Sequence, residues 1–105
     1  MNRILNLRGR AIAPNEPPPG CVYIGRRSRN GWQGSKWGNP YKVGPHGVLG
    51  EVLDKYRRYV CGSPDLLAAL PELAGLDLLC WYAPTPCHGD VLLDLLALRI
   101  GGRGA

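Results

Sequence analysis

The sequence predicts an α/β fold: a small, at least partly parallel sheet of about three strands, covered by about three helices. Short apolar runs have the length and composition of strands, and longer segments carry helix signals. Helical segments separate the last two predicted strands, which favours parallel pairing through a crossover connection. At 105 residues, the chain has room for one domain, which we assign to residues 1–105.

The first two strands are predicted near the N-terminus. Residues 3–8 alternate polar and apolar side chains, as in a half-buried strand. Residues 13–20 hold four of the ten prolines and predict a stiff, extended connection. Residues 21–24 form a β-branched and aromatic run that ends at Gly25, which is typical of a strand.

A long loop follows, over residues 25–47. It holds six glycines and shows no usable periodicity. A loop of this length in a compact domain is usually functional or disordered. Trp32, Trp37 and Tyr41 argue against disorder, so we expect a functional loop.

The second half of the chain predicts two helices, a strand and a last helix. The first helix covers residues 48–60 and closes at Gly62, and a second opens at residues 63–65 and runs to Leu73. A buried strand is predicted at 76–82, ended by the proline-rich residues 83–86. The last helix starts near residues 88–90 and ends around Arg99, before a frayed tail at 101–105. The apolar face expected on the first helix comprises Val48, Leu49, Val52, Leu53, Tyr56, Tyr59 and Val60.

The composition is that of a globular, cytoplasmic protein. Hydrophobic residues make up 45% and charged residues 20% of the chain. The first ten residues lack the continuous apolar run of a signal peptide, and no segment approaches the roughly 20 apolar residues of a membrane span. We therefore expect no membrane association and four reduced cysteines, with Cys21 and Cys61 as small core residues.

The formal charge of +5 is unevenly placed. Residues 1–62 hold eleven Lys/Arg against three Asp/Glu, giving +8, whereas residues 63–105 hold two against five, giving −3. This asymmetry favours an anionic partner for the N-terminal half, most simply phosphate groups. A solvated basic surface is the alternative interpretation.

Parallel topology also predicts where a ligand would bind. In such sheets, ligands collect at the carboxyl ends of the strands. The strand ending near Ile24 delivers the loop 26–41, and the strand ending near Cys80 delivers the segment 80–90. We therefore expect Trp37 or Asn39 to lie in contact with the helix start at 87–90.

The loop 26–41 has the chemistry of a phosphate-binding segment. Its glycines let backbone N–H groups approach an anion, its basic side chains supply charge, and its aromatic rings offer faces for a base. The spacing matches neither a P-loop nor a dinucleotide fingerprint. In the alternative interpretation, Trp37 and Tyr41 anchor the loop while the arginines are solvated. The candidate ligand-binding residues are Arg26, Ser35, Lys36, Trp37, Asn39 and Tyr41.

The segment 80–90 supplies the candidate catalytic residues Cys87, His88 and Asp90. Cys87 at a helix N-terminus would favour the thiolate, which predicts the most reactive of the four thiols. His88 would be a base oriented by Asp90. Alternatively, Cys80 is a core residue and His88 or Asp90 a helix cap.

A metal site is a weaker prediction for this segment, and no metal ligand is assigned. A zinc ion would take Cys80, Cys87 and His88, with a fourth ligand from Cys21, Cys61 or His46. The paired CxxC spacing typical of such sites is missing.

Three motifs resemble a family of small phage and bacterial proteins that is classed as a domain of unknown function. They are VYIGR at 22–26, GSKWGNPY at 34–41 and the CWxxPxPCHGD pattern at 80–90. The resemblance covers residues 22–96 and implies no mechanism. Related sequences often place a second cysteine where this chain has Tyr82, so a metal ligand at that position would be lost here.

The function expected from these observations is the binding or processing of a phosphate-bearing ligand, a nucleotide or nucleic acid. It would bind between the loop 26–41 and the helix start at 87–90. The sequence specifies no cofactor. One alternative is a non-enzymatic phage-type protein that binds a host protein through its basic half, and another is a zinc-stabilised module.

Overall fold

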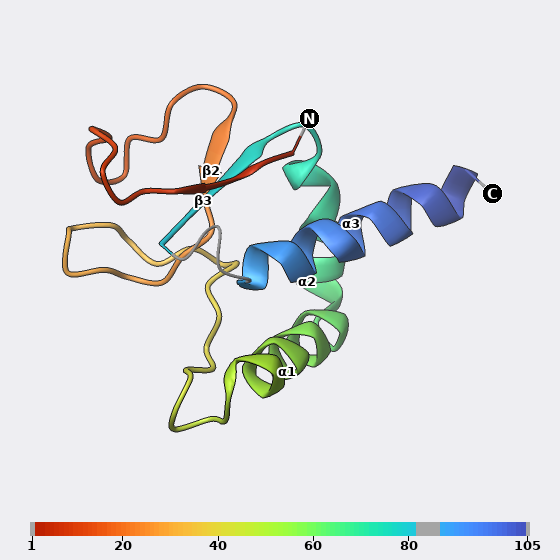
Figure 1. Ribbon diagram of the computed structural model, residues 1–105. Coiled ribbons are helices and arrows are strands. Elements are labelled where there is room, and N and C mark those ends of the chain that lie inside the picture. The colour runs from red at the N-terminus through yellow and green to blue at the C-terminus, as the bar shows by residue number, and fades with distance from the viewer. Residues whose placement is uncertain (1, 82–86, 105) are drawn as a thin grey trace.

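The computed structural model describes residues 2–81 and 87–104 and has the predicted α/β fold, with a three-stranded sheet and three α-helices (Figure 1). All strand pairs are parallel. The elements in chain order are β1 (Ile4–Asn6), β2 (Cys21–Tyr23), α1 (Leu49–Cys61), α2 (Pro64–Ala69), the 3₁₀ helix η1 (Leu70–Leu73), β3 (Asp77–Cys80) and α3 (His88–Gly104).

β3 lies at the centre of the sheet, in the order β1-β3-β2. Its residues Leu78, Leu79 and Cys80 are fully buried, as expected for a central strand that is apolar on both faces. Leu78 is paired with Ile4 on one side and with Val22 on the other. The carboxyl ends of all three strands therefore point to one edge of the sheet.

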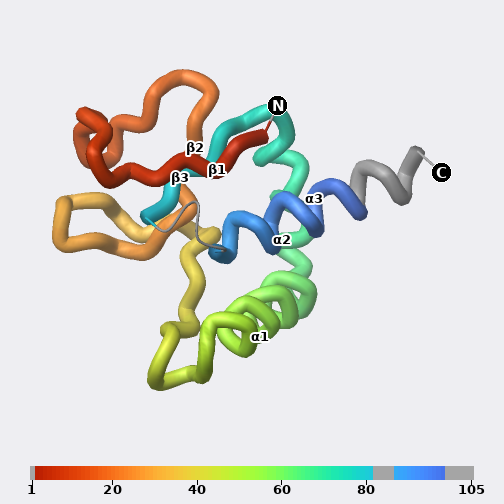
Figure 2. Tube along the Cα trace, viewed as in Figure 1, coloured from red at the N-terminus to blue at the C-terminus, as the bar shows by residue number. Residues whose placement is uncertain are grey.

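The two faces of the sheet are covered differently, because side chains alternate along each strand. Leu78 and Cys80 pack with Ile24 in the larger core, against the helices, which lie together on one side of the sheet (Figures 1 and 2). Leu79 and Tyr23 belong to a smaller cluster on the other face. There Trp32, from the long loop, stacks on Tyr23 with ring centroids 4.6 Å apart.

Helix α1 buries a narrower face than the sequence predicted. Val52, Tyr56 and Val60 recur every fourth residue and are buried. Val48 is 65% exposed because it is the N-cap and precedes the first helical turn. Tyr59 is 40% exposed because it lies at the margin of the buried stripe, about 60° around the helix from Tyr56. Both residues belong to the predicted apolar face, but they stay exposed at its margins.

The other helix boundaries follow their capping signals, except at the C-terminus. The Ser63 hydroxyl accepts a hydrogen bond from Leu66 N at 3.3 Å, and Pro64 starts α2 as predicted. Helix α3 continues to Gly104, although the glycine run predicted an end near Arg99. Within residues 2–81 and 87–104, no helix is long and apolar enough to cross a bilayer. The predicted turn at 83–86 lies outside the described residues.

The cysteines differ from expectation. Cys61 is exposed and Cys21 is half-buried, whereas Cys80 and Cys87 are buried. Cys61 ends α1, and Cys21 starts β2 at the sheet margin, so neither position reaches the centre of the core. The prediction of a core residue was therefore wrong for Cys61, whereas Cys21 packs, partly buried, against the smaller hydrophobic cluster.

Candidate functional site

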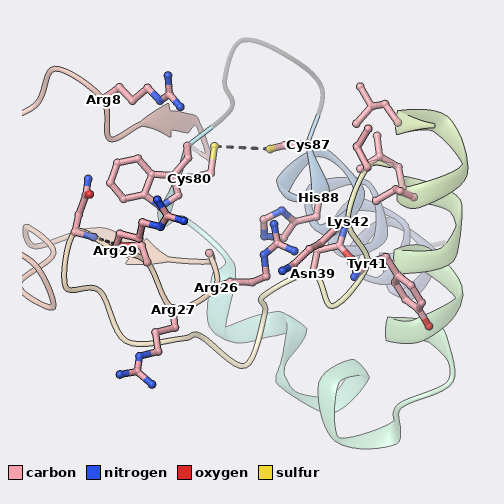
Figure 3. Close-up of a pocket in the computed structure, with 18 residues that line it drawn as sticks. Arg8, Arg26, Arg27, Arg29, Asn39, Tyr41, Lys42, Cys80, Cys87 and His88 are labelled. Carbon is pink, nitrogen blue, oxygen red and sulfur yellow. Dashed lines mark hydrogen bonds between the residues drawn. The ribbon is translucent and has the colours of Figure 1, made fainter. Parts of the chain in front are cut away.

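A cleft of about 1020 Å³ lies where the carboxyl ends of the three strands meet (Figure 3). Arg8 follows β1, Arg26 follows β2 and Trp81 follows β3, and all three line the cleft. Its volume is at the upper end of the range for small-molecule sites, roughly 300–1,000 Å³. The lining residues are Arg8, Gly25, Arg26, Arg27, Ser28, Arg29, Asn30, Asn39, Tyr41, Lys42, Val43, Leu49, Val52, Leu53, Cys80, Trp81, Cys87 and His88.

The cleft is strongly cationic. Four arginines and Lys42 line it, and none of the described lining residues carries a carboxylate. In Figure 3, Arg26 reaches toward His88 and Asn39, whereas Arg27 extends away from them. The Nη1 atom of Arg26 is buried and has no hydrogen-bond partner in residues 2–81 and 87–104. Burying an unsatisfied charged donor is costly, so this atom is suited to an anionic ligand.

The turn after β2 holds Arg26 in place through Tyr23. The Tyr23 hydroxyl donates to the backbone carbonyl of Arg26 at 2.5 Å and accepts the indole N–H of Trp81 at 2.9 Å. Gly25 is required here, because a Cβ atom would lie 2.4 Å from the Tyr23 hydroxyl oxygen. One phenol therefore connects the turn after β2 with the residue after β3.

The loop that follows is fixed to the core by buried anchors. Trp37 is 2% exposed, and its backbone carbonyl accepts the buried Tyr56 hydroxyl at 2.6 Å. Ser35 N donates to the carbonyl of Gly25, and Ser35 Oγ accepts from Trp37 N, each at 3.0 Å. Trp37 therefore has the role that the alternative interpretation of the loop gave it, that of an anchor on the core.

These anchors place Asn39 in the cleft. Asn39 is buried, and its Oδ1 accepts a hydrogen bond from Tyr41 N at 2.9 Å. Its Nδ2 has no protein partner in the described part of the chain, and the side chain lies beside Arg26 and His88 (Figure 3). Asn39 thus offers a second donor close to Arg26.

His88, the first residue of α3, is held in one tautomer. Its Nε2 lies 2.6 Å from the carbonyl oxygen of Ile24. Because a carbonyl only accepts, Nε2 carries the hydrogen and Nδ1 is left as an acceptor. Burial lowers the pKa of His88, and the nearby Arg26 charge lowers it further, although the Ile24 hydrogen bond opposes the shift. His88 is therefore neutral near pH 7.

Asp90 does not orient His88 as the sequence predicted. Its Oδ2 accepts a hydrogen bond from the backbone N–H of Cys87 at 2.8 Å, the returning hydrogen bond of a capping box at the start of α3. Neighbours at the start of a helix point in different directions, which separates the two side chains. The orienting group for His88 is the Ile24 carbonyl.

Cys87 is not in the environment of a stabilised thiolate. Its Sγ lies 3.7 Å from Cys80 Sγ in the core. The hydrogen bond with Cys80 raises the pKa of the Cys87 thiol, and burial raises it further. The helix N-terminus predicted the opposite shift, but contact with a second thiol and loss of water outweigh it.

The predicted zinc ligands do not gather. Cys21 pairs with Asp77 at the amino end of the sheet, opposite the Cys80 end, and Cys61 is exposed at the end of α1. Among the residues that the structure describes, no three His, Cys, Asp or Glu side chains form a group that could hold a metal ion. Tyr82, where related sequences often have cysteine, lies outside the described residues.

The structure brings together five of the predicted site residues at the cleft: Arg26, Asn39, Tyr41, Cys87 and His88. Ser35, Trp37 and Asp90 do not line the cleft. They take part in the backbone hydrogen bonds described above, which hold the loop and the start of α3. Lys36 Nζ forms an ion pair with Glu72 Oε1 at 2.8 Å. Trp32 and Trp37 are both buried, so their rings do not present the open faces for a base that the sequence suggested.

Sequence reasoning missed Trp81 and several basic residues of the cleft. Trp81 is half-buried and is an aromatic side chain that reaches the cleft. The rule that placed the loops after β2 and β3 at one edge, applied to β1, would have found Arg8. The missed basic residues are Arg8, Arg27, Arg29 and Lys42.

Comparison with known proteins gives one match. The family model described as Domain of unknown function (DUF4326) matches residues 6–98, which extends the resemblance over 22–96 at both ends. No curated protein and no solved structure matches the chain. Because the family model covers most of its length, the chain belongs to the DUF4326 family.

Proposed function

We propose that the cleft binds the phosphate groups of a nucleotide or nucleic acid. The buried Nη1 of Arg26, which lacks a hydrogen-bond partner among the described residues, carries this proposal. A guanidinium group matches the geometry of a phosphate and forms charge-assisted hydrogen bonds with it. A bound phosphate oxygen would satisfy this donor and offset the cost of its burial.

The surroundings of Arg26 support an anionic ligand over a neutral one. Other cations line the same cleft without a competing carboxylate among the described residues. Asn39 Nδ2 adds a neutral donor, and Trp81 adds an aromatic surface. Arginine forks and an amide donor suit a phosphate, and a cleft that also has apolar and aromatic lining suits a phosphate attached to a base.

We extend the proposal to catalysis, with His88 as a general base. Its neutral imidazole lines the cleft, and Nδ1 is the acceptor that would take a proton from a ligand hydroxyl or from water. The lowered pKa keeps His88 in the form that can act as a base. We place this activity in the cytoplasm, where nucleotides are abundant.

Titration calorimetry at low ionic strength tests the binding function, with ATP and a single-stranded oligonucleotide as probes. In Arg26→Gln, the loss of a charge-assisted contact worth about 1.5–3 kcal/mol should weaken binding roughly 10- to 160-fold. The matched control is Arg58→Gln, which removes an equal charge from an exposed side chain paired with Asp54 at 2.7 Å. The control should bind like the wild type.

Oligonucleotide binding should also weaken steeply as salt is added, because phosphate contacts release counterions. If inorganic phosphate, ATP and the oligonucleotide all fail to bind at low salt, the proposal is wrong. That result would favour the alternative of a phage-type protein whose basic half meets an acidic host protein.

A further inference from the structure

The cleft has two chemically different halves. Its cationic half comes from the ends of β1 and β2, where Arg8, Arg27 and Arg29 lie on one side in Figure 3. Its apolar half is built on α1, beside which Tyr41 and Lys42 lie in the same view. Arg26, Asn39 and His88 lie between the halves (Figure 3). The apolar side chains are Val43, Leu49, Val52 and Leu53.

We infer that the ligand is a mononucleotide, with its phosphates on the arginine half and its heterocyclic base on the apolar half beside α1. This inference rests on the proposed function and adds the class of ligand and its orientation. A base presents apolar faces and polar edges, so it suits an apolar wall bordered by donors and acceptors. Asn39 Nδ2 and His88 Nδ1 supply a donor and an acceptor between the halves.

The distribution of charge favours a mononucleotide over a strand. A strand calls for a cationic groove that follows its backbone through successive nucleotides, beyond the one nucleotide whose base is bound. In this cleft the arginines gather in one half, and among the described lining residues Lys42 is the single cation beside α1. The arrangement therefore matches a base that carries its phosphates on one side only.

Part of the apolar half is not needed for folding. Leu49 is half-buried and Val43 is 58% exposed, and neither belongs to the two hydrophobic core clusters. These two positions can therefore be changed with little effect on the core.

The test compares the affinities of ATP and tripolyphosphate, which share the phosphate chain but differ in the nucleoside. The wild type should bind ATP at least about 10-fold more tightly, because the base buries apolar surface. Leu49→Ser and Val43→Ser should each weaken ATP binding roughly 3- to 10-fold and leave tripolyphosphate binding unchanged. Leu98→Ser is the matched control, since Leu98 is 64% exposed on α3 and does not line the cleft.

The outcomes separate this inference from the proposed function. Equal affinities for ATP and tripolyphosphate, both unaffected by Leu49→Ser, would overturn the base subsite and leave the phosphate site standing. An oligonucleotide that binds more tightly than ATP, in a manner insensitive to Leu49→Ser, would overturn the mononucleotide. If neither ATP nor tripolyphosphate binds, the proposed function fails and this inference fails with it. Thermal unfolding of each variant shows whether it is folded.

Discussion

The Nε2 atom of His88 donates a hydrogen bond across 2.6 Å to the backbone carbonyl of Ile24. This bond ties the first residue of α3 to the end of β2, and so fixes two sides of the cleft relative to each other. Gly89 allows the close approach, because a Cβ atom there would lie 3.0 Å from Cδ1 of Ile24. The tautomer and the position of His88 are therefore consequences of how α3 meets the sheet.

The free energy of unfolding should fall as the pH drops from about 7 toward 5. The pKa of His88 is lowered in the folded protein, mainly by burial, and is about 6.5 in an unfolded chain. Between these values the unfolded state binds more protons, so acid favours unfolding. Urea unfolding at several pH values measures the effect.

Two histidine variants complete the pH experiment. In His88→Gln, the dependence on pH over this range should become shallower, whereas His46→Gln should retain the part due to His88. The pKa of Asp77 is lowered by its hydrogen bond with Arg3, so this group acts only at more acidic pH. An unchanged slope in His88→Gln would contradict the lowered pKa of His88 in the folded protein.

Replacing Arg26 should stabilise the ligand-free protein. Arg26→Met keeps an apolar stem but removes the buried donor without a partner, so the free energy of unfolding should rise by about 1 kcal/mol. Phosphate binding should be lost in the same variant. Urea unfolding measures the stability of this variant, and titration calorimetry measures its phosphate binding. A less stable Arg26→Met would show that the guanidinium serves the fold rather than a ligand.

Removing the Tyr56 hydroxyl should loosen the loop that carries Asn39. Tyr56→Phe leaves the buried carbonyl of Trp37 without its donor and should destabilise the protein by about 1–3 kcal/mol. Tyr59→Phe is the matched control on the same helix, because Tyr59 is exposed. Equal stabilities of the two variants would mean that the hydroxyl does not anchor the loop.

Alkylation should be fastest at Cys61 and slow at Cys87. Cys61 is exposed, whereas Cys87 is buried and the pKa of its thiol is raised by the contact with Cys80 and by burial. Mass spectrometry of iodoacetamide-treated protein measures the order, and urea-unfolded protein should show similar rates at all positions. Fast labelling of Cys87 in the folded protein would restore the reactive thiolate that the helix position alone predicted.

The sequence is sufficient for the fold because its local signals agree with one another. The apolar run of β3 indicates a central strand, Ser63 and Pro64 mark the start of α2, and the order of elements favours parallel pairing. Parallel pairing then places the loops after β2 and β3 at one edge, which locates the cleft.

The roles of individual site residues depend on contacts that sequence spacing does not contain. Trp37 has the aromatic ring of a stacking residue, but the ring is buried. The carbonyl of Trp37 is held by Tyr56, which lies on a helix distant in sequence. Lys36 pairs with Glu72, far along the chain. Cys87 starts a helix, yet a second thiol and burial decide the direction of its pKa shift. Each outcome is set by a tertiary neighbour.

Chemical-shift mapping with ¹⁵N-labelled protein and ATP tests the central claim most directly, because it locates the ligand as well as detecting it. We expect the largest amide shifts at Gly25, Arg26, Asn39 and His88, which lie around the cleft. The same titration on Arg26→Gln should show much smaller shifts at these positions. Shifts confined to other basic surfaces, such as Arg57 and Arg58 on α1, or no shifts at all, would contradict a phosphate site at the carboxyl edge of the sheet.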